Sequence, residues 1–317
     1  MTTQPTSQAP AADTLVGADV VGPPTSPARR GKRQSTSGRP STVLTIAMLA
    51  CVAYFLLPLF WVVVASTKSN ADLFSSFGLW FAEDFNLVTN LQDLFTAQDG
   101  IYLLWMRNSI LYAVVSAVGA ALLATMAGYA FAKLRFRGGT LLFSVILGAI
   151  MIPATALAIP TYLLFAQVGL VDTPWAIILP SLVSPFGVYL MRVYAAGAVD
   201  DSLLEAARVD GASEYRIFSQ VVLRLLAPGF VTVLLFQLVA TWNNYFLPLI
   251  MLNSADLFPL TVGLAQWQAT SQAGSGSAAL FSTVITGAMV SIIPLVVAFL
   301  FLQRYWQSGL TAGGVKQ

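Results

Sequence analysis

The chain has 317 residues, of which 57% are hydrophobic and only 9% are charged, whereas an average soluble domain carries about 25% charged residues. This composition excludes an ordinary soluble protein and indicates a chain that crosses a membrane several times. The net charge of +2 gives no reason to expect a nucleic-acid partner. The absence of histidine excludes a Ser-His-Asp triad and His-ligated haem or zinc, and one cysteine cannot form an internal disulfide. We therefore expect no catalytic residue, no metal site and no cofactor.

Residues 1–41 are rich in Thr, Ser, Pro, Ala and Gly and include a basic cluster, a composition typical of a disordered tail. The rest of the chain contains six stretches without a charged residue, each long enough to cross a bilayer. They cover about 43–66, 109–132, 140–169, 174–191, 228–252 and 279–303. We expect an all-α integral membrane fold, with six transmembrane helices in a domain of residues 42–304 and a C-terminal tail of residues 305–317.

The placement of Lys and Arg predicts the orientation of these spans, because cytoplasmic loops are enriched in both. If the N-terminus is cytoplasmic, 14 of the 16 Lys and Arg residues lie in inner segments. The first outer loop instead carries acidic residues: Asp72, Glu83, Asp84, Asp93 and Asp99. Both termini are therefore predicted to be cytoplasmic.

The spans carry two further signals. Ser116, Ala120, Ala124 and Gly128 recur every four residues, and such a small-residue face lets two helices approach closely. No span has an ionisable residue at its centre, as proton- or sodium-coupled carriers usually do. The chain also lacks a Gly-x-x-x-x-Gly-Lys-Ser/Thr phosphate loop. If it moves a solute, we expect the energy to come from another protein.

The longest inner loop, about 194–227, predicts two short helices joined by a tight turn. Asp200, Asp201 and Ser202 are candidate N-caps, and Ser202 with Glu205 has capping-box spacing. Gly211 suits the left-handed position that ends a helix, and Asp210 or Ser213 can start the next one. The second helix is amphipathic, with apolar side chains at Ile217, Phe218, Val221, Val222 and Leu225.

Two uses of this loop are compatible with its pattern. An amphipathic helix can rest on lipid headgroups. The small residues Ala206, Ala207, Gly211 and Ala212, together with interleaved acidic and basic residues, suit instead the docking of a cytoplasmic protein.

The loop sequence "EAARVDGASEYRIFSQVVLRLLAPG" resembles the Glu-Ala-Ala loop of the membrane subunits of binding-protein-dependent ABC importers. It is most similar to the second permease subunit of carbohydrate importers related to the maltose system. The resemblance extends through "STKSNADLF", "GYAFAKLRFRG", "TWNNYFLPLIML" and the terminal "RYWQSGLTAGGVKQ". It implies a type I ABC importer architecture in a bacterial cell membrane, with a homologous permease, two ATP-binding cassette ATPase subunits and an extracytoplasmic sugar-binding protein as partners.

The resemblance also implies roles for residues in three places. The residues that couple to an ATPase subunit would be Glu205, Ala206, Ala207, Asp210, Gly211 and Ala212. The last outer loop would contact the binding protein through Gln266, Trp267, Gln268, Ser271, Gln272 and Ser275. The chain departs from the family pattern at Arg224, where proline is usual, and we expect the second helix of the inner loop to run on toward Pro228 as a result.

A cluster of polar and aromatic residues on the fifth predicted span suits an uncharged sugar, which needs hydrogen-bonding groups and aromatic faces. It consists of Gln237, Thr241, Trp242, Asn243, Asn244 and Tyr245. Such residues also join membrane helices to one another, so pathway lining is one of two interpretations.

The sequence as a whole predicts a permease subunit of an ATP-driven importer of disaccharides or oligosaccharides, which performs no covalent chemistry itself. The alternative is a stand-alone secondary carrier or channel for a small polar solute. That alternative predicts intramembrane charges, which the spans lack.

Overall fold

The computed structural model describes residues 42–272 and 280–312, and every regular element within these ranges is helical. The helices are α1 (Thr42–Ser66), α2 (Asn70–Ser75), α3 (Leu87–Thr96), α4 (Ile101–Lys133), α5 (Gly139–Ile150), α6 (Ala154–Gln167), α7 (Trp175–Ser181), α8 (Pro185–Ala198), α9 (Asp201–Val209), α10 (Glu214–Ile217), α11 (Leu223–Leu225), α12 (Ala227–Trp242), α13 (Phe246–Met251), α14 (Leu260–Gln272) and α15 (Leu280–Ala312). The chain forms two units, residues 1–51 and 52–317. The contacts described below lie within the second unit.

Four helical stretches are long and apolar enough to cross a membrane: Thr42–Ser66, Leu87–Lys133, Trp175–Ala198 and Phe281–Gln303. Two more candidates arise only if a bent helix pair counts as one span. The first pair is α5 with α6, bent by 106°, and the second is Glu214–Leu225 with α12, bent by 77°. The all-helical membrane fold is therefore confirmed, with four to six spans.

Three of the six predicted spans are not single helices. The stretch 140–169 breaks at Met151–Pro153, between α5 and α6. The stretch 174–191 breaks at Leu182–Ser184, between α7 and α8. The stretch 228–252 breaks at Asn243–Tyr245, and only the six residues of α13 follow. The uncharged composition of these stretches was correctly identified, but it carries no information about where the helix bends.

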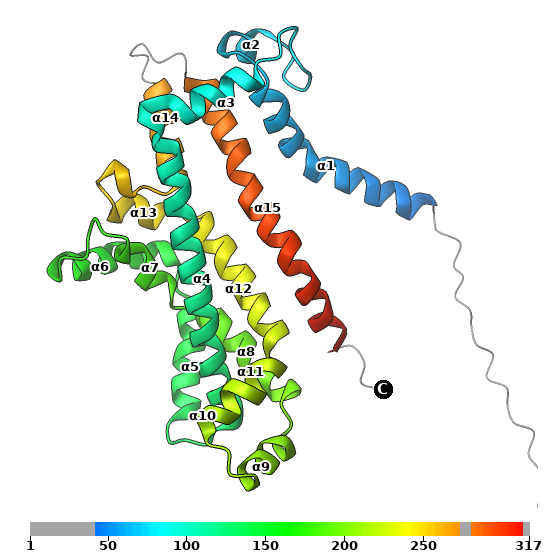
Figure 1. The fold of residues 1–317 in the computed structure, drawn as a ribbon, viewed down its shortest axis with the longest axis vertical. Coiled ribbons are helices and arrows are strands. Elements are labelled where there is room, and N and C mark those ends of the chain that lie inside the picture. The colour runs from blue at the N-terminus through cyan, green and yellow to red at the C-terminus, as the bar shows by residue number, and fades with distance from the viewer. Residues whose placement is uncertain (1–41, 273–279, 313–317) are drawn as a thin grey trace, which may run out of the picture. The chain divides into compact units, whose positions relative to one another are not determined.

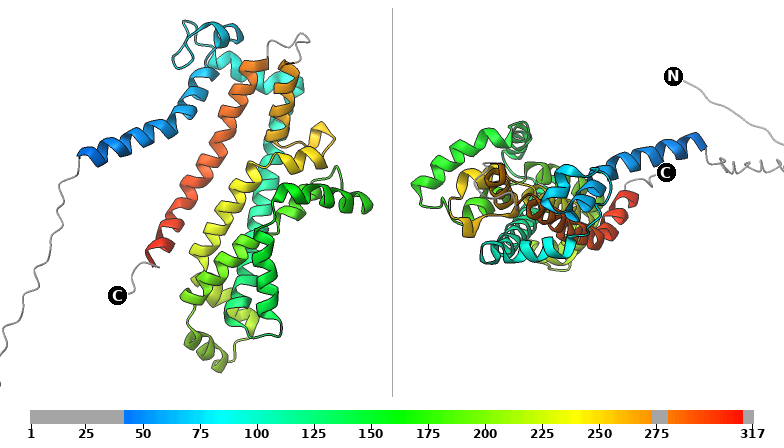
Figure 2. Two further views of the ribbon diagram at one scale, coloured as in Figure 1. Left: turned by 180° about the vertical axis from the view of Figure 1, so that it is seen from behind. Right: turned by 90° about the horizontal axis from the view of Figure 1, so that it is seen from above.

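Helix α4 packs against α8 through the predicted small-residue face. Ser116, Ala120 and Ala124 are at most 1% exposed. A Cβ atom placed on Gly128 would lie 2.5 Å from Met191 Cβ and 2.7 Å from the Arg192 backbone nitrogen, so no larger residue fits without separating the helices. The prediction is confirmed, and Figures 1 and 2 show α4, α8 and α12 side by side.

The segment between α1 and α3 is organised around a buried lysine. Lys68 is 2% exposed, and its Nζ donates hydrogen bonds to Ser76 Oγ at 2.9 Å and to the Phe77 carbonyl at 2.7 Å. The Asn90 side-chain amide donates to the carbonyls of Ser66 and Lys68 at 2.8 and 2.9 Å. These bonds tie the end of α1 to α3.

The two predicted terminal tails can be compared with the described residues. Helix α15 continues to Ala312, so residues 305–312, predicted as part of a tail, extend the last helix. The predicted tail 1–41 and residues 313–317 lie outside the described residues.

Candidate functional site

The inner loop folds as a short helix, a tight turn and a second helical segment, as predicted. Helix α9 begins after Asp200, whose carboxylate accepts from the Ser202 backbone N–H at 3.0 Å and from Ser202 Oγ at 2.9 Å. Both bonds lower the pKa of Asp200, and the bond from the Ser202 backbone has the larger effect. Asp200 is thus the cap, and the predicted capping box of Ser202 and Glu205 is wrong because the Ser202 hydroxyl donates to Asp200 instead.

The turn after α9 is held by a left-handed residue and an ion pair. Gly211 has φ +79°, and Ser213 caps α10 by accepting from the Arg216 N–H at 3.4 Å. Arg208 Nε lies 2.7 Å from Glu214 Oε1, and this bond raises the pKa of Arg208. The ion pair bridges the turn from the last residues of α9 to the first residue of α10, so the turn is closed on both sides of Gly211.

The loop is anchored to the helical bundle by buried apolar side chains. Leu204 of α9 is 2% exposed, and Ile217, Val222 and Leu226 are fully buried. They form one cluster with residues of α4, α8 and α12, including Met191. These side chains pack the loop directly against α4, α8 and α12.

The opposite face of the loop is open. Glu205, Ala206, Asp210 and Gly211 are exposed, and Ala207 and Ala212 are half-buried. The six predicted coupling residues therefore lie together on and around one helix–turn surface, seen at the foot of Figure 1. Sequence reasoning missed two large neighbours, Val209 at 87% and Tyr215 at 82% exposed. Their signal was available, since both are apolar residues next to the turn.

Arg224 stands in a helical segment, as expected from the loss of proline. A π turn covers Phe218–Val222 and leads into α11. The chain then bends by 77° into α12, which has proline in its first turn. The helix thus runs through Arg224 and stops before Pro228.

The second candidate site is a cavity of about 520 Å³ where three helix breaks meet. Each break contributes the end of one helix and the start of the next to the wall. The pairs are α5 with α6, α7 with α8, and α12 with α13. This volume falls in the range of about 300–1,000 Å³ that is usual for pockets of small molecules.

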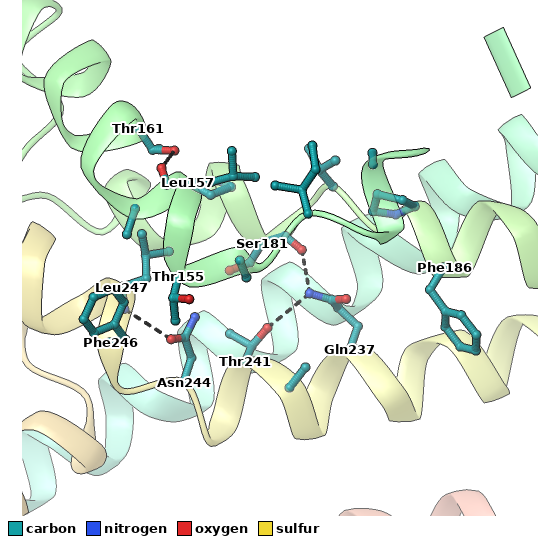
Figure 3. Close-up of a pocket in the computed structure, with 18 of the residues that line it drawn as sticks. Thr155, Leu157, Thr161, Ser181, Phe186, Gln237, Thr241, Asn244, Phe246 and Leu247 are labelled. Carbon is teal, nitrogen blue, oxygen red and sulfur yellow. Dashed lines mark hydrogen bonds between the residues drawn. The ribbon is translucent and has the colours of Figure 1, made fainter. Parts of the chain in front are cut away.

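The polar side chains of the cavity come from α6, from α7 and from α12 with the break that follows it (Figure 3). They are Thr155, Thr161, Ser181, Gln237, Thr241 and Asn244. Gln237 Nε2 donates to the Ser181 carbonyl at 2.8 Å and lies 3.5 Å from Thr241 Oγ1. The Asn244 side-chain oxygen accepts from the Leu247 N–H, in the first turn of α13, at 3.4 Å. The aromatic rings of Phe186 and Phe246 complete the wall.

The structure brings together three of the six residues predicted to line a pathway. Gln237, Thr241 and Asn244 face the cavity, whereas Trp242, Asn243 and Tyr245 are not among its lining residues. Asn243 Nδ2 donates to the Val239 carbonyl of its own helix at 2.9 Å, and Trp242 packs against the apolar core near α7 and α13. Thr155, Thr161, Ser181 and Phe186 were missed because they come from other segments. Phe246 was missed although it directly follows the predicted cluster.

The predicted last outer loop is wrong for residues 266–272, which form the end of α14. Gln266, Gln268 and Gln272 are exposed. Trp267 and Ser271 are buried, and Trp267 Nε1 donates to Gln98 Oε1 at 3.1 Å. The Trp267 ring also contacts the Trp105 ring, tilted by 57° with 4.8 Å between the ring centroids. Ser275 lies outside the described residues.

Comparison with known proteins identifies the family. Residues 118–311 match the family described as binding-protein-dependent transport system inner membrane component. The arabinooligosaccharides transport system permease protein AraQ of Halalkalibacterium halodurans is 36% identical over 288 residues, which cover 90% of this chain and 99% of the relative. The lactose transport system permease protein LacG of Rhizobium radiobacter is 28% identical, over 86% of this chain and 96% of the relative.

A solved structure has the same fold. It is a chain of a bacterial ABC transporter involved in the import of the acidic polysaccharide alginate, with a TM-score of 0.71 and 24% identity. The match covers 83% of this chain and 95% of the other. The chain therefore belongs to the family of binding-protein-dependent transport system inner membrane components, and it is a multi-pass permease subunit of an ABC importer rather than an enzyme.

Proposed function

We propose that this permease carries disaccharides or oligosaccharides through the cavity at the three helix breaks. The observation that supports the proposal is the pairing of helix ends. At a helix break, carbonyl groups at the end of one helix and N–H groups at the start of the next lack a partner within their own helix. Side chains cap some of them here, such as the Gly187 and Leu247 N–H groups. Each sugar hydroxyl both donates and accepts hydrogen bonds, so a wall that offers both kinds of group suits it.

The side chains of the cavity have the same dual character. Thr, Ser, Asn and Gln all donate and accept, and six such residues share the wall with two aromatic rings. The relatives named for arabinooligosaccharides and lactose point to the same class of cargo. Discontinuous helices around a central site are also a recurrent arrangement in transporters.

The proposed mechanism is alternating access driven by partners. The exposed surface of α9 and the following turn docks on an ATPase subunit, and Leu204, Ile217, Val222 and Leu226 pass its movement to the helices around the cavity. Nucleotide-driven closure of two ATPase subunits would then favour one of two bundle conformations, through the difference in binding free energy between them.

The remaining partners follow from the family. A second, homologous permease would complete the pathway, and an extracytoplasmic binding protein would deliver the sugar near Gln266, Gln268, Gln272 and Ser275. Both termini would lie in the cytoplasm of a bacterial cell, because this orientation places 14 of the 16 Lys and Arg residues inside.

The first experiment is gentle detergent purification of the tagged chain from its own host, with mass spectrometry of the proteins that co-purify. We expect an ATPase subunit, a second permease and a binding protein, and sugar-stimulated ATP hydrolysis by the complex. A chain that purifies alone and moves solute into vesicles without ATP would contradict the proposal.

Two variants test the docking surface, Gly211→Pro and Glu205→Lys. Both should insert and assemble normally, yet lose the stimulation of ATP hydrolysis by sugar-loaded binding protein. Gly211→Asn is the matched control, because asparagine tolerates a left-handed φ and a Cβ atom at this position meets no atom within 4 Å. Normal uptake by both variants would show that the surface is not the docking site.

A further inference from the structure

The wall of the cavity is uncharged throughout. Its lining residues are Ala, Ile, Leu, Val, Pro, Phe, Thr, Ser, Asn and Gln, none of which ionises near neutral pH. A carboxylate or phosphate group placed there would lose part of its hydration and would find no cation on the wall that this chain supplies. Transfer of an unpaired charge into such a site is strongly unfavourable.

The helix ends do not replace the missing cation. A helix start carries a partial positive charge and a helix end a partial negative charge. Each of the three breaks presents one of each to the cavity, for example the end of α5 at Ala149–Ile150 and the start of α6 at Ala154–Thr155. The two partial charges at a break oppose each other, so the main chain adds hydrogen-bonding groups without a net positive field.

The stretches of chain that supply the lining residues contain no basic residue. Between residues 138 and 191 and between 225 and 303, the only Asp, Glu, Lys or Arg residues are Asp172 and Asp256. Asp172 joins the loop between α6 and α7 to the segment after α13, because its carboxylate accepts from the Asn253 and Ser254 backbone N–H groups at 2.8 and 2.9 Å. Its carboxylate thus has a structural role in that loop and offers no positive charge to the cavity.

We propose that this cavity is a charge filter, which admits uncharged saccharides and rejects saccharides that carry a carboxylate or phosphate group, whatever the binding protein delivers. The inference rests on the proposed function, since it assumes that the sugar passes here. The fold itself does not impose the filter, because a transporter of the same fold is named for an acidic polysaccharide. The lining side chains of this chain impose it.

The test compares two probes of nearly equal size and shape, cellobionamide and cellobionate, which differ in one terminal group. Both have the same opened terminal sugar, and one is neutral while the other is a carboxylate. Saturation-transfer NMR titrations use the purified full complex at millimolar sugar, without binding protein, so that only the membrane subunits are probed. We expect the Kd for cellobionate to be at least tenfold higher than the Kd for cellobionamide.

Substitutions of lining residues test whether the cavity wall causes this difference in Kd. Thr155→Lys, facing Asn244 in Figure 3, should reduce the tenfold ratio to near one. Thr155→Gln should preserve the ratio, whatever its effect on either Kd. Thr161→Lys, from the same helix, replaces Thr155→Lys if that variant does not assemble.

The outcomes separate the filter from the proposed function. Equal Kd values for the two probes in the wild-type complex, or a ratio that both lysine variants leave unchanged, would overturn the filter alone. Binding of neither probe, in a complex that takes up an anionic solute instead, would overturn the filter and the sugar assignment together. Binding of neither probe, with preferential uptake of another neutral solute, would overturn the sugar assignment and support the filter.

Discussion

Lys133 Nζ lies 2.8 Å from Asp201 Oδ1, so an ion pair joins the last residue of α4 to the first residue of α9. The lysine side chain is 9% exposed and the aspartate side chain 76% exposed. Such a pair adds at most about 1 kcal/mol to stability. The pair connects α9, which carries the proposed docking surface, to α4, which packs against α8.

Reversing one charge of this pair should impair coupling more than folding. Lys133→Asp and Asp201→Lys should each lower the unfolding free energy by no more than about 1 kcal/mol, while the stimulation of ATP hydrolysis falls several-fold. The double exchange, with both substitutions, should recover most of the stimulation. Single variants that couple as well as the wild type would show that the buried contacts of α9 suffice.

Because α4 approaches α8 closely at Gly128, we expect that position not to tolerate a larger side chain. Gly128→Ala should lower the unfolding free energy by about 1–3 kcal/mol, as overpacking does, because the added methyl group would overlap Met191 and the Arg192 backbone. Gly197→Ala in α8 is the control, since a Cβ atom there meets nothing within 4 Å. Thermal unfolding in detergent measures both, and equal melting temperatures would contradict the packing.

The hydrogen bonds to Asp172 predict how stability depends on pH. Bonds from the Ser254 side chain, the Ser254 backbone and the Asn253 backbone lower the pKa of Asp172. A carboxyl group with a lowered pKa stabilises the fold above its unfolded pKa of about 3.9, and this contribution is lost as pH falls through the lower folded value. We therefore expect the contribution of Asp172 to the unfolding free energy to stay constant between pH 8 and 5.

Asp172→Asn isolates this contribution. The variant should have a lower melting temperature than the wild type at neutral pH, and the difference should shrink as the pH falls below about 4. Asparagine is suitable because it adopts positive φ readily, and Asp172 has φ +58°. A difference that stays constant with pH would indicate that the charge of Asp172 contributes nothing.

The Asn90 side chain is predicted to be essential to the segment between α1 and α3. Asn90→Leu leaves the buried carbonyls of Ser66 and Lys68 without this donor, which should cost about 1–3 kcal/mol. Asn86→Ala is the matched control, because its side-chain bond to the Asp84 carbonyl is long, at 3.4 Å, and exposed. Melting temperatures of the two variants that coincide would contradict the prediction.

Several local features of the fold were predictable from neighbouring residues, although the capping box of Ser202 and Glu205 was not among them. Gly211 ends a helix and Ser213 starts one through contacts within a few residues. Helix breaks were not readable, because prolines mark them unreliably in this chain. Pro153 stands at the break before α6, but Pro160 and Pro294 lie inside continuous helices.

Only half of the predicted pathway residues line the cavity, for a similar reason. Gln237 and Thr241 are four residues apart and so share a helix face, which made them visible as a pair. Trp242 is the next residue and points about 100° away around the helix, so its place in the same polar run was misleading. Thr155 and Ser181 come from elements more than 50 residues earlier in the chain, and only the tertiary fold brings them to Gln237.

The three helix breaks have a consequence for how specificity can change over time. Part of the hydrogen-bonding capacity at a break belongs to peptide groups, which every substitution except one to proline retains. A lineage could therefore alter its preferred cargo by exchanging a few threonines or phenylalanines while the basic ability to hold a polyol persisted. Alanine scanning would accordingly underestimate the contribution of the helix breaks to sugar binding. Replacing peptide bonds at the breaks by esters would measure the contribution of the peptide groups.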